Sequence, residues 1–378
     1  MWACRPDVCI PGKADHMRIL ILTNNDIGLY KFRRELLEAL LREKHEVHIA
    51  LPYGDYVPLM EKMGCVFHDT PFDRHGINPL AELKLIAKYR LLIKEIMPDV
   101  VLTYTIKPNI YGGMACAALD VPYVANVTGL GTAVENGGMM QRITISLYRF
   151  GLRKAQRVFF QNAENRDFMR VHHAIKGQNE LLPGSGVNLA HFAVRDYPNG
   201  DTVDFVFVAR IMREKGIDQY LDAAEAIRKK YPETRFHICG FCEQDYAGSL
   251  KRLHDDGTII YHGAVTDMGP IYQMSSCTVH PTFYPEGMSN VLLESCASAR
   301  PIITTDRAGC REIVEDGVNG FVVKQRDSAD LIDKIEKFLA LSWDERRQMG
   351  LAGRAKIERE FDRKIVVEKY MKVIENGL

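Results

Sequence analysis

The chain has little that would mark a specialised class of protein. It carries no net charge, because 49 lysines and arginines balance 49 aspartates and glutamates, and this excludes an overall field that would attract nucleic acid. It lacks any run approaching the roughly 20 apolar residues that span a bilayer. Its nine cysteines are an odd number without regular spacing, which suits a reducing cytosol better than a disulfide framework.

Two of these cysteines, in Cys239-Gly-Phe-Cys242, have the spacing of a zinc or redox pair. A zinc site would need a second pair of ligands at similar spacing, and the sequence has none. We therefore interpret the two thiols as small apolar residues at the end of a strand.

The first 16 residues differ from the rest of the chain. Prolines and charged residues interrupt any hydrophobic core of a secretory signal there. The first strand-like run, MRILIL, begins at Met17. We expect residues 1–16 to be a tag or a disordered extension.

From Met17 onward, short apolar runs alternate with helical periods, and a second such cycle follows the turn-rich stretch 183–188. This alternation is typical of buried parallel strands joined by helices, and a chain of 378 residues is too long for one core. The sequence predicts an α/β fold of two doubly wound, Rossmann-like domains that face a cleft. We assign residues 17–185 to the first and 186–361 to the second, and expect the helix 362–378 to pack back on the first.

The most informative stretch lies in the second half, where seven residues separate Glu286 from Glu294. Gly287 is expected to open a helix and to let a ligand approach the backbone. The first free amides and the dipole of that helix would bind a diphosphate; they belong to Met288, Ser289, Asn290 and Val291. We expect Glu286 to accept hydrogen bonds from sugar hydroxyls and Glu294 to reach a ribose diol. Taken alone, the two glutamates could equally be a helix cap and a solvated side chain.

Two basic residues, Arg210 and Lys215, follow the first strand of the second domain. Doubly wound sheets bind ligands at the carboxyl ends of their strands. Cations there can pair with a diphosphate and neutralise the charge that develops as it leaves. A solvated basic turn is the alternative interpretation.

In this order and spacing, the motifs resemble the retaining GT-B glycosyltransferases of family 4, over nearly all of residues 17–378. The E-x7-E signature is met by Glu286 and Glu294, the diphosphate-binding pair by Arg210 and Lys215, and the end of the donor domain by GCREIVEDGVNGFVV. The first half, with VLTYTIKPNIYGG and PYVANVTGLG, is similar to the branch that builds capsule, O-antigen and glycan-carrier oligosaccharides.

The resemblance implies a hexosyl- or N-acetylhexosaminyltransferase that takes its sugar from a UDP-sugar, or less commonly a GDP-sugar, with retention of configuration. It implies neither a cofactor nor a metal, because basic side chains and helix amides neutralise the diphosphate. Glu286, Arg210 and Lys215 would be the catalytic residues. The leaving phosphate would accept the proton of the acceptor, a saccharide carried on a polyprenyl diphosphate.

One position departs from the family pattern. Many members have a histidine before the glycine that follows the PYVAN strand, where it touches the donor sugar, but here Thr128 precedes Gly129. A threonine cannot carry positive charge, so recognition of the sugar is expected to differ. Asn25, Gly28 and Lys107 are candidates for the acceptor side of the cleft, with loop shaping or solvation as the alternative for each.

Basic and apolar residues interleave in the segment 142–176 and in the helix 80–96. Such a face can lie on anionic lipid, which predicts a cytoplasmic enzyme bound peripherally to the inner face of the cell membrane. A solvated helix face is the alternative. Two rival functions remain: a UDP-sugar 2-epimerase of the same fold, and a catalytically silent nucleotide-sugar binder. TIKPN and VTGLG favour the transferase.

Overall fold

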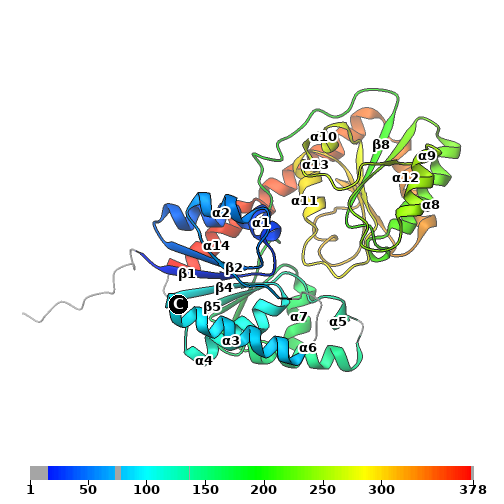
Figure 1. The fold of residues 1–378 in the computed structure, drawn as a ribbon. Coiled ribbons are helices and arrows are strands. Elements are labelled where there is room, and N and C mark those ends of the chain that lie inside the picture. Colours follow the sequence, from blue (N-terminus) through cyan, green and yellow to red (C-terminus); the bar gives the residue numbers. More distant parts are fainter. Residues whose placement is uncertain (1–15, 73–77, 136, 376–378) are drawn as a thin grey trace, which may run out of the picture.

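A computed structural model describes residues 16–72, 78–135 and 137–375. It contains two parallel α/β sheets, each with helices on both faces (Figure 1). The expected fold class is therefore confirmed. The extension expected over residues 1–16 lies outside the described residues except for His16, whose ring nitrogen Nδ1 is 3.1 Å from the carbonyl oxygen of Lys44.

The first sheet has seven strands in the order β3-β2-β1-β4-β5-β6-β7. Its strands are β1 (Arg18–Leu22), β2 (Glu46–Leu51), β3 (Val66–Asp69), β4 (Val100–Tyr104), β5 (Tyr123–Val127), β6 (Arg157–Phe160) and β7 (Gln178–Leu181). Its helices are α1 (Asp26–Arg42), α2 (Val57–Met63), α3 (Pro79–Ile96), the π-helical turn η1 (Pro108–Gly112), α4 (Gly113–Leu119), α5 (Thr132–Glu135), α6 (Gly138–Gly151) and α7 (Ala163–Val171). The strand order reverses between β1 and β4.

The second sheet has six strands in the order β10-β9-β8-β11-β12-β13. They are β8 (Val203–Val208), β9 (Thr234–Cys239), β10 (Ile260–Tyr261), β11 (Cys277–His280), β12 (Ile302–Thr305) and β13 (Gly320–Val323). The helices are the 3₁₀ turn η2 (Arg213–Lys215), α8 (Ile217–Lys230), α9 (Ala247–Asp255), α10 (Gly269–Met274), α11 (Asn290–Ala297), α12 (Ser328–Ala340) and α13 (Trp343–Glu360). This order reverses between β8 and β11. The last helix, α14 (Arg363–Glu375), leaves this sheet.

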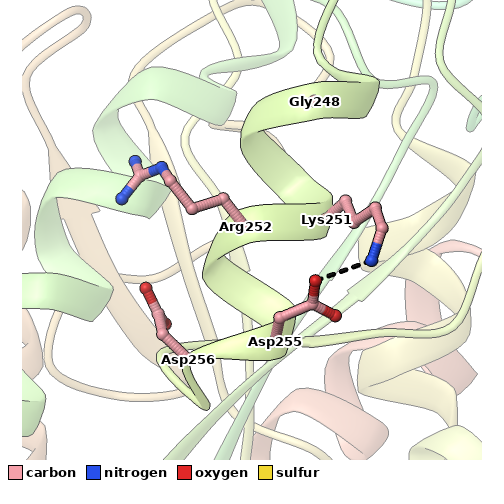
Figure 2. A pocket seen from close by; sticks show the side chains of 5 residues that line it. All are labelled: Gly248, Lys251, Arg252, Asp255 and Asp256. Atoms are coloured by element: carbon pink, nitrogen blue, oxygen red, sulfur yellow. Dashed lines mark hydrogen bonds and ion pairs between the residues drawn. The ribbon is translucent and has the colours of Figure 1, made fainter.

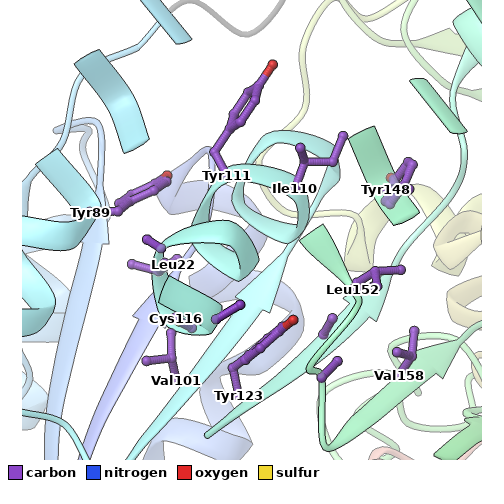
Figure 3. Close-up of a cluster of buried hydrophobic side chains, with 14 of the residues drawn as sticks. Leu22, Tyr89, Val101, Ile110, Tyr111, Cys116, Tyr123, Tyr148, Leu152 and Val158 are labelled. Carbon is purple, nitrogen blue, oxygen red and sulfur yellow. The ribbon is translucent and has the colours of Figure 1, made fainter. Parts of the chain in front are cut away.

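The central strands of the first sheet are apolar on both faces. All five residues of β4 are buried, as expected for a parallel strand covered by helices on each side. One buried cluster lies between the first sheet and helices α3, α4 and α6, and includes Leu22, Val101 and Tyr123 (Figure 3). Leu22 in this cluster is the last residue of β1, next to the switch point, where doubly wound sheets bind ligands.

The chain passes between the domains twice. Val187 pairs with Asp362 as an isolated parallel bridge, and the next residues form α14, which lies on the first domain (Figure 1). Its Val366 and Tyr370 belong to the same buried cluster as residues of β1 and β2, and the Tyr370 hydroxyl accepts a 2.8 Å hydrogen bond from Nδ2 of Asn126 on β5. Helix α14 therefore completes the first domain from the far end of the chain.

Candidate functional site

Strand β11 and helix α11 position the predicted donor residues. The helix begins at Asn290, with Ser289 as its N-cap, three residues later than the sequence predicted. The reason is that the Ser289 amide donates a 2.8 Å hydrogen bond to the carbonyl oxygen of Gly309. Of the four amides expected for a diphosphate, from Met288 to Val291, that of Ser289 is thus already bonded within the protein.

Glu286 and Lys215 form one ion pair, although the sequence assigned them to different parts of a ligand. The Lys215 ammonium donates to Oε1 of Glu286, and the side chains are only 10% and 15% exposed. The same ammonium lies 4.6 Å from the centroid of the Tyr284 ring. Lys215 is held there by η2, between β8 and α8. The structure therefore brings the two residues together at the carboxyl ends of the strands that flank the switch point.

Arg210 occupies a more open position beside this pair. Its guanidinium forms a 3.1 Å ion pair with Oε1 of Glu243 and lies 5.4 Å from the Tyr284 ring centroid. Tyr284 thus lies close to both basic side chains. It was not identified from the sequence.

Charge stabilises the ionised form of Glu286. Burial alone would raise the pKa of its carboxyl group, but Lys215, with a smaller contribution from Arg210, outweighs burial and lowers it. The carboxyl group of Glu294 behaves in the opposite way, since burial raises its pKa to about 7 despite a 3.2 Å hydrogen bond from the Tyr272 hydroxyl. The two signature glutamates therefore have different electrostatic environments.

His280 is a third member of the site that sequence reasoning missed. It is the last residue of β11 and only 2% exposed, and its Nε2 lies 4.0 Å from Oε1 of Glu286. Burial, together with Lys215, lowers the pKa of its imidazole to about 4, so the ring is neutral at physiological pH. The histidine in CTVHPT, at the carboxyl end of a predicted strand, was the available signal.

The first domain covers this site directly. A Cβ atom added at Gly287 would lie 2.0 Å from the carbonyl oxygen of Thr128, and one added at Gly129 would lie 3.4 Å from the Gly287 amide. Backbone of the first domain therefore occupies the space beside Gly287 in this structure, and the approach of a ligand to the Gly287 backbone stays a prediction. Thr128 and Gly129 thus lie beside the loop that carries Glu286 and Gly287.

Asn162 also joins the two domains and was not identified from the sequence. It is the N-cap of α7 and is 2% exposed. Its Nδ2 donates to the carbonyl oxygens of Gly287, at 2.6 Å, and Glu286, at 3.1 Å. The loop that carries Glu286 is thus held from the first domain.

The three remaining candidates make contacts within the first domain. Asn25 is the N-cap of α1 and accepts a 2.5 Å hydrogen bond from the amide of Gly28, which agrees with a loop-shaping role for both. Lys107, directly before η1, forms a 2.5 Å ion pair with Glu82 on α3. The structure does not bring these residues into contact with Glu286.

Other features predicted from the sequence are less marked. Cys239 is the buried last residue of β9, and Cys242 lies 3.9 Å from the Tyr261 hydroxyl. Within the described ranges, no group of three or more His, Cys, Asp or Glu residues could hold a metal ion. No described helix is both long and apolar enough to cross a membrane.

A hollow on the outer surface of α9 carries no recognisable site. Its lining includes Gly248, Lys251, Arg252 and Asp255 (Figure 2). Lys251 and Asp255 form a 2.6 Å ion pair one helical turn apart, which is ordinary for an exposed helix face. The predicted donor residues lie between the domains instead.

Two facing Rossmann-like domains with this constellation define a GT-B glycosyltransferase. The first domain matches the family described as "Glycosyl transferase 4-like" over residues 18–162, and the second matches "Glycosyl transferases group 1" over residues 202–340. The chain belongs to this family of enzymes, which confirms the resemblance noted in the sequence.

Three similar proteins match the chain over nearly their whole length. The N,N'-diacetylbacillosaminyl-diphospho-undecaprenol alpha-1,3-N-acetylgalactosaminyltransferase of Campylobacter jejuni is 25% identical over an alignment of 379 residues, and the match covers 94% of this chain and 98% of that protein. A glycosyltransferase from Rickettsia africae superposes with a TM-score of 0.80 at 16% identity, covering 96% of this chain and 98% of the other. Alr3699/HepE of Anabaena, in complex with UDP-glucose, superposes with a TM-score of 0.78 at 18% identity, covering 96% and 100%.

Proposed function

We propose that this glycosyltransferase moves a sugar, with retention of configuration, from a UDP-sugar to a hydroxyl of a polyprenyl-diphosphate-linked saccharide. The observation that carries the proposal is the buried Lys215–Glu286 pair on the second domain, whose Glu286 loop lies against Thr128 and Gly129 of the first. The pair supplies a cation for a diphosphate and a carboxylate for sugar hydroxyls in one enclosed place. Water is displaced from such a place when the domains meet, which strengthens both interactions.

The proposed reaction uses these residues. Lys215 and Arg210 neutralise the diphosphate as the bond between the anomeric carbon and the phosphate oxygen breaks, with its electron pair going to that oxygen. The acceptor oxygen bonds to the anomeric carbon on the same face and passes its proton to the leaving phosphate. Glu286 orients the transferred sugar and Glu294 the ribose. Neither a metal nor a cofactor has a step in this scheme.

The choice of substrates rests on the relatives. The UDP-glucose complex of the Anabaena protein supports a UDP-sugar as donor. The name of the Campylobacter enzyme supports an acceptor linked to a polyprenyl diphosphate, and an N-acetylhexosamine as the transferred sugar.

The test is a donor screen in which released UDP or GDP is measured with and without lipid-linked saccharides. The proposal expects UDP release that depends on the acceptor, and a glycan product with a retained α-linkage. A changed sugar without any acceptor would identify an epimerase instead. Heat of UDP binding without turnover on any pair would identify a silent binder.

Exposed apolar and basic side chains on α3 and α6 support a peripheral position on anionic membrane. Both helices pack against η1 and α4. Leucines and other apolar residues stand in solvent there: Leu80, Leu83 and Leu91 on α3, and Met139, Ile143 and Phe150 on α6, between 47% and 78% exposed. The basic residues beside them would face the phospholipid headgroups.

We expect the variant Arg90→Glu/Arg142→Glu/Arg153→Glu to lose binding to anionic liposomes by roughly 100-fold at low salt, since each basic residue near such a surface contributes about 1 kcal/mol. These positions are preferable to Arg149 and Arg157, because Arg149 donates to the His172 carbonyl and Arg157 pairs with Glu180. Liposome sedimentation measures the effect.

The matched control reverses three exposed charges on the second domain, as Lys229→Glu/Arg252→Glu/Lys324→Glu. It has the same net charge as the test variant and should still sediment. UDP titration should be unchanged in both. If the test variant and the wild type sediment equally, the membrane role is wrong and α3 and α6 present an ordinary solvated face.

Removing the Lys215 ammonium should weaken UDP binding. A charge-assisted hydrogen bond contributes about 1.5 to 3 kcal/mol, so Lys215→Ala should raise the Kd for UDP by roughly 10- to 150-fold. Titration calorimetry measures this directly. Arg213→Ala, which removes a neighbouring side chain that is 75% exposed, is the control and should bind as the wild type does. An unchanged Kd in folded Lys215→Ala protein would remove this lysine from the diphosphate site.

A further inference from the structure

The imidazole of His280 is polar and buried, and the contacts of the described residues do not account for its position. The residue is 2% exposed, yet within the described part of the chain neither ring nitrogen has a hydrogen-bond partner. Buried polar atoms in native structures are nearly always paired, and an exception calls for a physical reason. The lack of partners indicates that the imidazole forms its hydrogen bond in a different state of the site.

Side chains from the loop after β11, from η2 and from β8 lie around the ring. Glu286, in the loop after β11, has its Oε1 4.0 Å from Nε2. Lys215 approaches from η2 and holds the same oxygen. The Phe207 ring on β8 has its centroid 6.5 Å from that of the imidazole. Glu286 therefore offers an acceptor 4.0 Å from the unpaired Nε2, a distance slightly longer than that of a hydrogen bond.

The proposed function makes conflicting demands on Lys215. In this structure its ammonium neutralises Glu286, but during the reaction it would have to contact a diphosphate. A buried carboxylate that loses the cation paired with it carries a large desolvation cost. Some other donor must then approach Glu286 if the nucleotide is to bind well.

We propose that His280 is that donor: when Lys215 turns to the diphosphate, the Nε2–H of His280 hydrogen-bonds to Glu286 and replaces the lost ion pair. This inference rests on the proposed assignment of Lys215 to the diphosphate. His280 is then a positioning residue that acts through Glu286, because it touches neither sugar nor phosphate. The neutral ring suffices, in the tautomer with hydrogen on Nε2, since a neutral donor can stabilise a carboxylate.

The exchange predicts energetic coupling between His280 and Glu286 that a packing role would not produce. Without a donor at position 280, binding of UDP leaves the Glu286 carboxylate unpaired. We therefore expect His280→Leu to raise the Kd for UDP by roughly 10-fold or more. In a Glu286→Gln background no buried charge is left behind, so the same substitution should change the Kd by less than about threefold.

The experiment is a double-mutant cycle, measured by titration calorimetry with UDP alone. His280→Phe repeats the test with a second apolar side chain, in case His280→Leu fails to fold, and His280→Gln, which keeps an N–H donor, should retain most of the affinity. Equal losses in the wild-type background and in the Glu286→Gln background would overturn the exchange and leave His280 a packing residue. If the wild type does not bind UDP at all, the donor assignment fails and this inference fails with it. If the donor screen shows a changed sugar without any acceptor, the proposed transfer reaction is wrong, but the inference about UDP binding and His280 is unaffected.

Discussion

Replacing Glu286 by alanine should lower turnover by roughly 10²- to 10³-fold, the size of effect seen when one group that stabilises a transition state is removed. The carboxylate is assigned to the transferred sugar, where contacts strengthen as the reaction proceeds. The affinity for UDP should not fall, because in this variant Lys215 has no buried carboxylate to leave when it binds the diphosphate. Steady-state kinetics at saturating donor and calorimetry with UDP separate the two quantities.

Glu294→Ala is the matched comparison. This glutamate is assigned to the ribose, where binding is uniform between ground state and transition state, so the substitution should weaken UDP and donor binding while kcat changes little. The signature glutamates have opposite pKa shifts, which agrees with separate roles. Loss of affinity alone in both variants would refute this division of labour.

Gly287→Ala should reduce kcat/KM by at least roughly 100-fold, since displacement of a reacting group by about 1 Å can cost that much. The added methyl group would lie 2.0 Å from the Thr128 carbonyl oxygen and 2.5 Å from Oε1 of Gln161. The domains then cannot meet as they do here, and the contacts of Asn162 to the loop are lost. Neither core is touched, so the melting temperature should change little.

The control for this prediction is Gly248→Ala in α9, where an added Cβ meets no atom within 4 Å. It should keep full activity. Small-angle scattering should report a larger radius of gyration for Gly287→Ala than for Gly248→Ala. If both variants are equally active and compact, contact with Thr128 is not needed for the reaction.

The fold could be predicted from the sequence because its strands and helices are determined by patterns of neighbouring residues. A strand buried on both faces, such as Val100–Tyr104, is a continuous apolar run, and amphipathic helices separate such runs. The start of α11 was placed wrongly because it depends on a backbone hydrogen bond from Ser289 to Gly309, twenty residues away in the chain. Bonds of this kind leave no pattern in the residues around a helix.

The site was only partly predictable for a related reason. Glu286 and Lys215 could be selected as charged residues after strands, but their mutual pairing without a ligand is a tertiary property. Asn162 was recognisable only as a helix cap, whereas its hydrogen bonds to the Glu286 and Gly287 carbonyls depend on how two separately folded domains meet. His280 could have been found in the sequence as a polar side chain at the end of a predicted central strand.

The return of α14 to the first domain has a consequence for synthesis. A nascent chain emerges from the ribosome with its first residues leading, yet the surface of β1 and β2 is covered by Val366, Tyr370 and Ile374. Arg363 fixes this helix by hydrogen bonds to the Lys31 carbonyl and the Glu35 carboxylate on α1. The first domain to be translated is therefore the last to be finished, and part of its apolar surface waits for the whole second domain to be made.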